Sequence, residues 1–216
     1  MKRSIYRDIL KVNALRDIQN HASNARGFSL VELLVASAIG LVVLGAMYSV
    51  FTFQNKTFNT QELIVEMQQN VRSAMDIMVD EIQMAGCNRG TSNLPGISSP
   101  SGSSIRFTQD LNGDADVSDD NEDITYSYNA GQKCVTRQNA GGNALTFAEN
   151  IESLVFSYYD STGSEITDPA ANISKIRMTK LRIVGKTAGS DISNDPGHIY
   201  RNFTLESYVT LRNIAY

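Results

Sequence analysis

The sequence predicts an α+β fold in which one long N-terminal helix packs on an antiparallel β-sheet. An apolar run at residues 28–53 continues into an amphipathic run that contains neither proline nor glycine up to Ala85. Beyond residue 100, segments rich in β-branched and aromatic residues alternate with turn sequences such as NAGGN and DSTGS. A chain of 216 residues is long enough to bury a substantial core around such an arrangement.

The apolar run, residues 28–53, has the length of a membrane-spanning helix. At ~1.5 Å per residue it reaches ~39 Å, more than a ~30 Å hydrocarbon layer requires. Residues 1–27 carry six basic and two acidic side chains, so their net charge is +4, whereas the whole chain has a formal charge of -4. Basic flanks stay on the cytoplasmic side, which predicts that residues after Lys56 are exported. The remaining charge of -8 lies in this exported part and argues against nucleic-acid binding.

The amphipathic run predicts that the helix continues from about residue 29 to about residue 85. Its apolar residues follow helical spacings of three and four and form one stripe: Ile64, Met67, Val71, Met75, Met78, Ile82 and Ala85. Gly86 is a suitable stop signal. We expect this stripe to dock on the sheet as core.

Strands are expected at residues 104–109, 123–129, 133–138, 144–149, 151–160, 175–186 and 203–214. Residues 91–100 are rich in Ser, Gly, Pro and Asn and are expected to form a loop.

The junction between the basic segment and the apolar run has the sequence RGFSLVELLVA. It resembles the type IV prepilin signature, in which a membrane peptidase cuts after a glycine and the new N-terminal residue is methylated. The resemblance implies cleavage between Gly27 and Phe28, N-methylation of Phe28, and an assembly role for Glu32, the fifth residue of the mature chain. The implied partner of the Glu32 carboxylate is the α-amine of Phe28 in a neighbouring subunit.

Later segments, among them VRSAMDIMVDEIQMAG and KIRMTKLRIVGKT, resemble the pilus-assembly protein W family of minor pilins. That family is related to the J pseudopilin of type II secretion, which is the alternative, as is a membrane-anchored calcium-binding periplasmic domain outside any filament. The resemblance implies a leader at 1–27, an assembly helix at 28–53, an amphipathic helix at 54–86 and a β-rich periplasmic domain at 87–216. Expected partners are the prepilin peptidase, major and minor pilins and the inner membrane, with the pilus or its tip as the final location.

The stretch DLNGDADVSDDNED alternates oxygen-bearing side chains with other residues. This pattern predicts a structural Ca²⁺ site formed by Asp110, Asn112, Asp114 and Asp116, helped by Asp120 or Glu122. A solvated acidic loop is the competing interpretation. No other cofactor is expected, and no motif for catalysis is found in the sequence, which argues against an enzyme.

Two cysteines, Cys87 and Cys134, lie in the part expected to be exported, where disulfides persist. We therefore expect a bridge that fastens the end of the helix to the sheet. Two unpaired buried thiols are the alternative.

Overall fold

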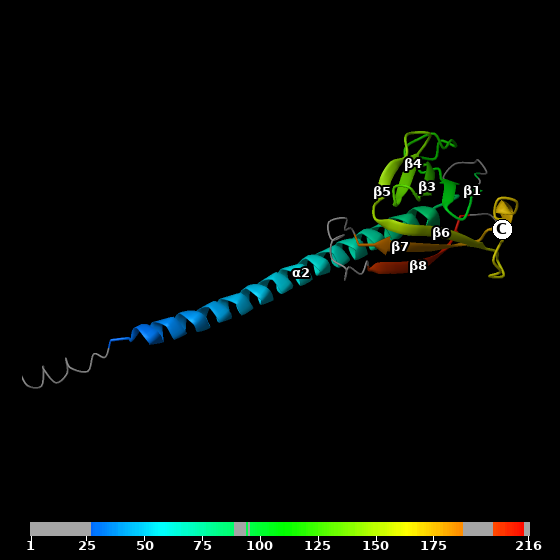
Figure 1. Cartoon of the computed structure of the whole chain (residues 1–216). Helices are drawn as coiled ribbons and strands as arrows, with labels where there is room; N and C mark the ends of the chain where they lie inside the picture. Colours follow the sequence, from blue (N-terminus) through cyan, green and yellow to red (C-terminus); the bar gives the residue numbers. More distant parts are fainter. Residues whose placement is uncertain (1–26, 89–93, 95, 188–200, 214–216) are drawn as a thin grey trace, which may run out of the picture. The chain divides into compact units, whose positions relative to one another are not determined.

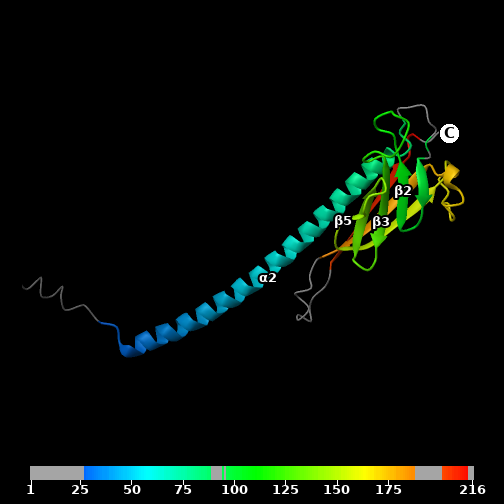
Figure 2. The ribbon, with the colours of Figure 1, turned by 90° about the horizontal axis from the view of Figure 1, so that it is seen from above.

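The computed structural model describes residues 27–88, 94, 96–187 and 201–213. The leader expected at residues 1–27 lies outside this range except for Gly27. The described residues fall into two compact units, one that ends at Thr57 and one that begins at Phe58. Helix α2, Leu30–Gln83, passes through the boundary between them and is continuous in Figures 1 and 2.

Helix α2 confirms the helix expected from about residue 29 to about residue 85. The backbone of Gly86 has φ +77°, a left-handed conformation that glycine adopts without steric cost, and its N–H donates to the carbonyl of Thr108. A Cβ at this position would lie 3.2 Å from the carbonyl oxygen of Asn213. Gly86 therefore ends the helix and lets the chain pass close to its neighbours.

The strands form two antiparallel sheets where one was expected. The first sheet has the order β1-β2-β3-β4-β5, and the second has the order β6-β7-β8. In the first sheet, the strands are β1 (Ile97–Pro100), β2 (Ser104–Thr108), β3 (Asp123–Asn129), β4 (Cys134–Asn139) and β5 (Leu145–Ala148). In the second sheet, they are β6 (Ile151–Tyr159), β7 (Met178–Lys186) and β8 (Asn202–Thr210).

The chain leaves the first sheet at Glu149 and Asn150, the two residues between β5 and β6. Asn150 has φ +56°, in the left-handed region that asparagine tolerates better than most residues. This sharp corner directs β6 to pair with β7 and not with β5. Alternation of apolar residues predicts strands but not which strands share a sheet, which explains why the second sheet was missed.

Two smaller corrections concern element boundaries. The loop expected at 91–100 ends in strand β1, because Ile97 is buried and the segment pairs with β2 at the edge of the sheet, where Pro100 is tolerated. The strand expected from residue 175 begins at Met178, after a short 3₁₀ turn at Ile173–Lys175.

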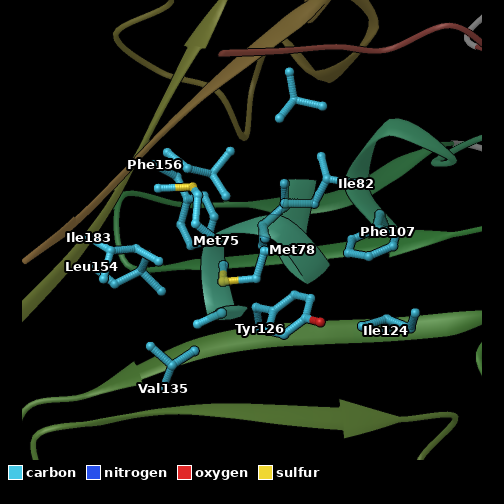
Figure 3. Packing of buried hydrophobic residues seen from close by; sticks show 14 of the residues in the cluster. Met75, Met78, Ile82, Phe107, Ile124, Tyr126, Val135, Leu154, Phe156 and Ile183 are labelled. Atoms are coloured by element: carbon cyan, nitrogen blue, oxygen red, sulfur yellow. The ribbon is translucent and has the colours of Figure 1, made fainter. Parts of the chain in front are cut away.

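The core of the second unit lies around the apolar stripe of α2. Met75, Met78 and Ile82 are buried, and Figure 3 shows their side chains between Phe156 and Ile183 on one side and residues of the first sheet on the other. The first sheet contributes seven buried residues to this cluster: Ile97, Ile105, Phe107, Ile124, Tyr126, Val135 and Ala148. The predicted stripe is thus core, except that Ile64 is only half-buried.

Strand β7 approaches the helix very closely. A Cβ on Gly185 would lie 2.3 Å from the Val71 Cγ2 atom and 3.2 Å from the Met67 Cγ atom. Only glycine therefore allows this strand and this helix face to pack at their present distance.

Candidate functional site

The N-terminal segment of α2 exposes nearly all of its apolar side chains within its own unit. Phe28 is 89% exposed and Met47 64% exposed, and between residues 28 and 53 Thr52 is the one side chain that is half-buried. The helix is long and apolar enough to cross a membrane by length and composition. Apolar side chains in such number need a lipid or protein environment, since a water-exposed patch of this extent is unfavourable.

Several serine and threonine hydroxyl groups along α2 donate to carbonyls of the helix itself. Ser37 donates to the carbonyl of Leu33 at 2.8 Å and Ser49 to that of Gly45 at 3.0 Å. Thr52 and Thr57 bond in the same manner to Ser49 and Phe53. These internal bonds suit a helix placed in lipid, where polar groups find no water.

Glu32 closes a capping box with Ser29 at the start of α2. The Ser29 backbone N–H and hydroxyl donate to Glu32 Oε2 at 2.9 and 3.0 Å, and the Glu32 N–H donates back to Ser29 Oγ at 3.2 Å. The Ser-x-x-Glu spacing is the sequence signal of this motif, and it was overlooked because the same residues were interpreted as a processing signal. The carboxylate thus lies beside the backbone next to Phe28, with a local role even in a single chain.

A second candidate site is the loop between β2 and β3. Carboxylate oxygens of Asp114, Asp116, Asp119 and Glu122 lie within 4.8 Å of one another. Of the expected ligands, Asp114, Asp116 and Glu122 are brought together, and Asn112 lies beside them, with its Nδ2 donating to Asp114 at 3.0 Å and to Asp119 at 2.7 Å.

Asp110 and Asp120 are directed elsewhere. Asp110 is fully buried, and its carboxylate accepts bonds from the backbone N–H groups of Gly113 and Ala115, which fold the loop. Asp120 Oδ1 accepts a bond from Asn139 Nδ2 at 3.0 Å. Both therefore serve the loop conformation rather than the cluster.

Asp119 is the member of the cluster that was not predicted from the sequence. Residues 119–122 form a β-turn, in which the Glu122 N–H bonds to the Asp119 carbonyl at 3.3 Å and Asn121 has φ +68°. An asparagine at the third position of such a turn was the available signal, because it tolerates the left-handed backbone and so brings the first and fourth residues together. Desolvation and the nearby charges of Asp114, Glu122 and Asp116 raise the pKa of the Asp119 carboxyl.

The expected disulfide is absent, and both cysteines are free thiols. Cys87 lies beside Asp110, whose N–H bonds to its carbonyl at 2.7 Å, near the end of the sheet where β2 stops and β3 begins. Cys134 pairs with Asn129 at the opposite end of β3. The seven residues of β3 separate these ends, and six steps at ~3.3 Å each far exceed the ~4.4–6.8 Å between Cα atoms that a disulfide allows.

Comparison with known proteins supports the interpretation of the N-terminal helix. The family model of the prokaryotic N-terminal methylation motif matches residues 22–48. Pilin-like protein PilA3 of Thermus thermophilus is 38% identical over 71 residues, which cover 32% of this chain and 30% of that protein. The match therefore spans less than a third of the length of that relative.

Among solved structures, the type IV-like pilin TTHA1219 from Thermus thermophilus matches 70% of this chain and 100% of its own, with a TM-score of 0.42 and 12% identity. A score at this level establishes no relationship by itself. The N-terminal segment of this chain thus carries the prokaryotic N-terminal methylation motif, and over 71 residues the chain is similar to a pilin-like protein.

Proposed function

We propose that this chain is a minor pilin of the pilus-assembly protein W family. In this proposal it is stored in the inner membrane with its sheets in the periplasm, is cleaved after Gly27, and then enters a pilus or primes its assembly. The observation that carries the proposal is the contrast within α2: the methylation motif at 22–48 coincides with the segment whose apolar side chains are exposed. A segment of that kind is built to be covered by something outside its own chain.

Storage in the membrane follows from the composition of this segment and of its flank. The hydroxyl groups of Ser37 and Ser49 bond to carbonyls of the same helix, and the apolar length exceeds the hydrocarbon layer. The basic residues before Gly27 favour a cytoplasmic location for the cleavage site, and the acidic remainder then faces the periplasm. The prepilin peptidase would act on this cytoplasmic face.

Assembly would give Glu32 its second role. Cleavage creates an α-amine at Phe28, and in a filament the Glu32 carboxylate of one subunit would meet the amine of the next. Each of these charges is unfavourable alone in an apolar environment, and the pair would neutralise both, because one subunit supplies the carboxylate and the next supplies the amine. Removal of one partner strands the other as a buried charge, which typically costs about 3–5 kcal/mol.

The capping box makes a sharper test of this role possible. Glu32→Gln removes the charge but retains the shape and hydrogen-bonding capacity of a capping-box residue, whereas Ser29→Ala breaks the box and leaves the charge. We expect Glu32→Gln to be inserted and cleaved after Gly27 but to copurify poorly with partner pilins. Ser29→Ala should copurify nearly as well as the wild type.

If the two variants behave in the reverse manner, Glu32 acts as a helix cap and the charge-pair mechanism is wrong. Mass spectrometry of the extracted protein tests processing in the same cells, with loss of residues 1–27 and a methylated amine as the expected result. Gly27→Val should block cleavage, because a β-branched side chain crowds the scissile bond. An uncleaved wild-type chain in cells with an active peptidase would favour a plain membrane anchor instead of a pilin.

The J pseudopilin of type II secretion shares the same motif and is the alternative assignment. The two assignments differ in their partners: a minor pilin copurifies with pilus subunits, and a J pseudopilin with the other pseudopilins of a secretion system. Crosslinking at the exposed helix face, followed by identification of the linked subunits, separates them.

A further inference from the structure

The acidic cluster between β2 and β3 contains a buried carboxylate that lacks a hydrogen-bond partner on one oxygen. Glu122 is 1% exposed, and its Oε1 accepts bonds from the backbone N–H groups of Leu111 and Asn112 at 2.8 and 3.3 Å. Its Oε2 is buried and has no hydrogen-bond partner. A buried carboxylate oxygen without a donor is unfavourable, and the side chains grouped with Glu122 are themselves three carboxylates.

The part of the chain that the structure describes pairs no cation with this cluster. Residues 107–132 contain seven acidic side chains and no Lys, Arg or His. Two arginines lie nearby, but Arg106 pairs with Asp123, and Arg137 pairs with Glu81 and donates to the Asn121 side chain. Among the described residues, no ion pair reaches Asp114, Asp116, Asp119 or Glu122.

We propose that Asp114, Asp116, Asp119 and Glu122 bind one Ca²⁺ ion. Oxygen ligands 2.3–2.6 Å from a common centre lie up to about 5 Å apart, which is compatible with oxygens that are all within 4.8 Å of one another. Calcium takes six to eight oxygen ligands in flexible geometry, so three exposed carboxylates and a buried one leave room for waters. Zinc sites, by contrast, are built mainly from Cys and His, and this loop has neither.

The proposed ion would brace the junction between helix α2 and the first sheet. The Glu122 carbonyl accepts the N–H of Gln109 at 2.8 Å, and the next residue, Asp110, bonds through its own N–H to the carbonyl of Cys87. Through these backbone hydrogen bonds, Glu122 links the acidic cluster to the segment that follows the end of the helix at Gly86. Binding to the folded form alone would stabilise this junction by mass action.

The test uses the full-length processed protein in detergent after removal of divalent ions with a chelator. Calorimetric titration with CaCl₂ should show one site, and excess Ca²⁺ at about 100 times Kd should raise the Tm by ~5 °C or more. MgCl₂ should bind more weakly, because Mg²⁺ demands octahedral geometry and retains its waters. Acidification should weaken Ca²⁺ binding, since the carboxylates must be ionised to act as ligands.

Two substitutions remove one charge each from the cluster, Asp119→Asn and Glu122→Gln, and both should weaken Ca²⁺ binding at least ~10-fold. Asp120→Asn is the matched control, because it removes the same charge one residue away from a carboxylate that is bonded to Asn139. It should retain nearly all of the affinity. If Glu122→Gln fails to fold, the exposed pair Asp116→Asn and Asp119→Asn decides the question.

Absence of heat and of a Tm shift for the wild type at millimolar Ca²⁺ would overturn the proposal. So would an equal loss of affinity in Asp120→Asn and Asp119→Asn, which would indicate general attraction to an acidic surface. The proposal extends beyond assembly of a pilus: leader cleavage and copurification with pilins can succeed whether or not this loop binds calcium.

Discussion

Helix α2 contains two segments that differ in where their apolar side chains lie: one segment buries them within the chain, and the other exposes them. Between residues 58 and 83, one stripe of apolar residues faces the sheets, and Met75, Met78 and Ile82 on this stripe are buried. Between residues 28 and 53, apolar residues surround the helix and are exposed within their own unit. A one-sided stripe indicates a helix that completes its packing within the chain, whereas a helix that is apolar on all sides requires a membrane or other helices.

The largest expected effect is on solubility. A chain that begins at Phe58, the first residue of the second unit, should be monomeric in buffer without detergent, whereas the longer chain should require detergent. The physical reason is that the deletion removes the exposed apolar run and retains the buried stripe. Size-exclusion chromatography with light scattering measures this, and aggregation of the shorter chain would show that its own exposed side chains, such as Phe58 and Val65, also need a partner.

A methionine in each segment provides the second test. Met78 is fully buried and Met47 is 64% exposed, so Met78→Ala should destabilise the second unit by about 2–5 kcal/mol through lost burial and an internal cavity. Met47→Ala should leave its free energy of unfolding within about 0.5 kcal/mol. Urea unfolding of both proteins in detergent, followed by the near-ultraviolet circular dichroism of tyrosine, measures the difference. Equal effects would contradict the separation of the two segments.

Glycines sharpen the comparison with a smaller effect. Gly185→Ala should cost ~1–3 kcal/mol, because the new Cβ overlaps Val71 Cγ2, whereas a Cβ at Gly40 would meet no atom within 4 Å and Gly40→Ala should be tolerated. The double variant Gly185→Ala/Val71→Ala should lose less than the sum of the single variants, since Val71→Ala removes the overlapping atom. Strict additivity in urea unfolding would place the strain elsewhere.

The smallest effect concerns alkaline pH. Burial raises the pKa of the Tyr126 hydroxyl above its ordinary value of 10, and its hydrogen bond to Glu81, 2.6 Å long, raises it further. The folded state therefore favours the protonated tyrosine, so this contribution is fully present below pH 10 and is lost as the pH rises above 10.

Unfolding in urea between pH 9 and pH 11 should accordingly show a steeper loss of stability in the wild type than in Tyr126→Phe, by up to ~1.4 kcal/mol per pH unit. Tyr48→Phe is the control, because it removes the same hydroxyl from an exposed position on the N-terminal segment. A Tyr126→Phe profile parallel to that of the wild type would show that other groups carry the alkaline transition.

Patterns among residues close in sequence determine most of the secondary structure of this molecule. Helical spacing predicted the buried stripe, and Gly86 predicted the end of the helix. Seven of the eight strands that the structure describes follow from β-rich segments between turn residues. The prepilin-like motif can be recognised from the order of Gly27, Phe28, Glu32 and the apolar run, because such a motif is defined by neighbouring residues in the sequence. All of these are properties of neighbours in sequence, which is why the sequence alone sufficed.

Tertiary structure decided what depends on contacts between distant segments. The corner at Asn150 divided the strands into two sheets, and strand register placed Cys87 and Cys134 at opposite ends of β3, where no bridge can form. Folding of the acidic loop buried Asp110 in backbone hydrogen bonds and put Asp119 in its place in the cluster. Spacing along a chain does not specify the direction of a turn, so which carboxylates meet is determined only when the loop is held between two strands.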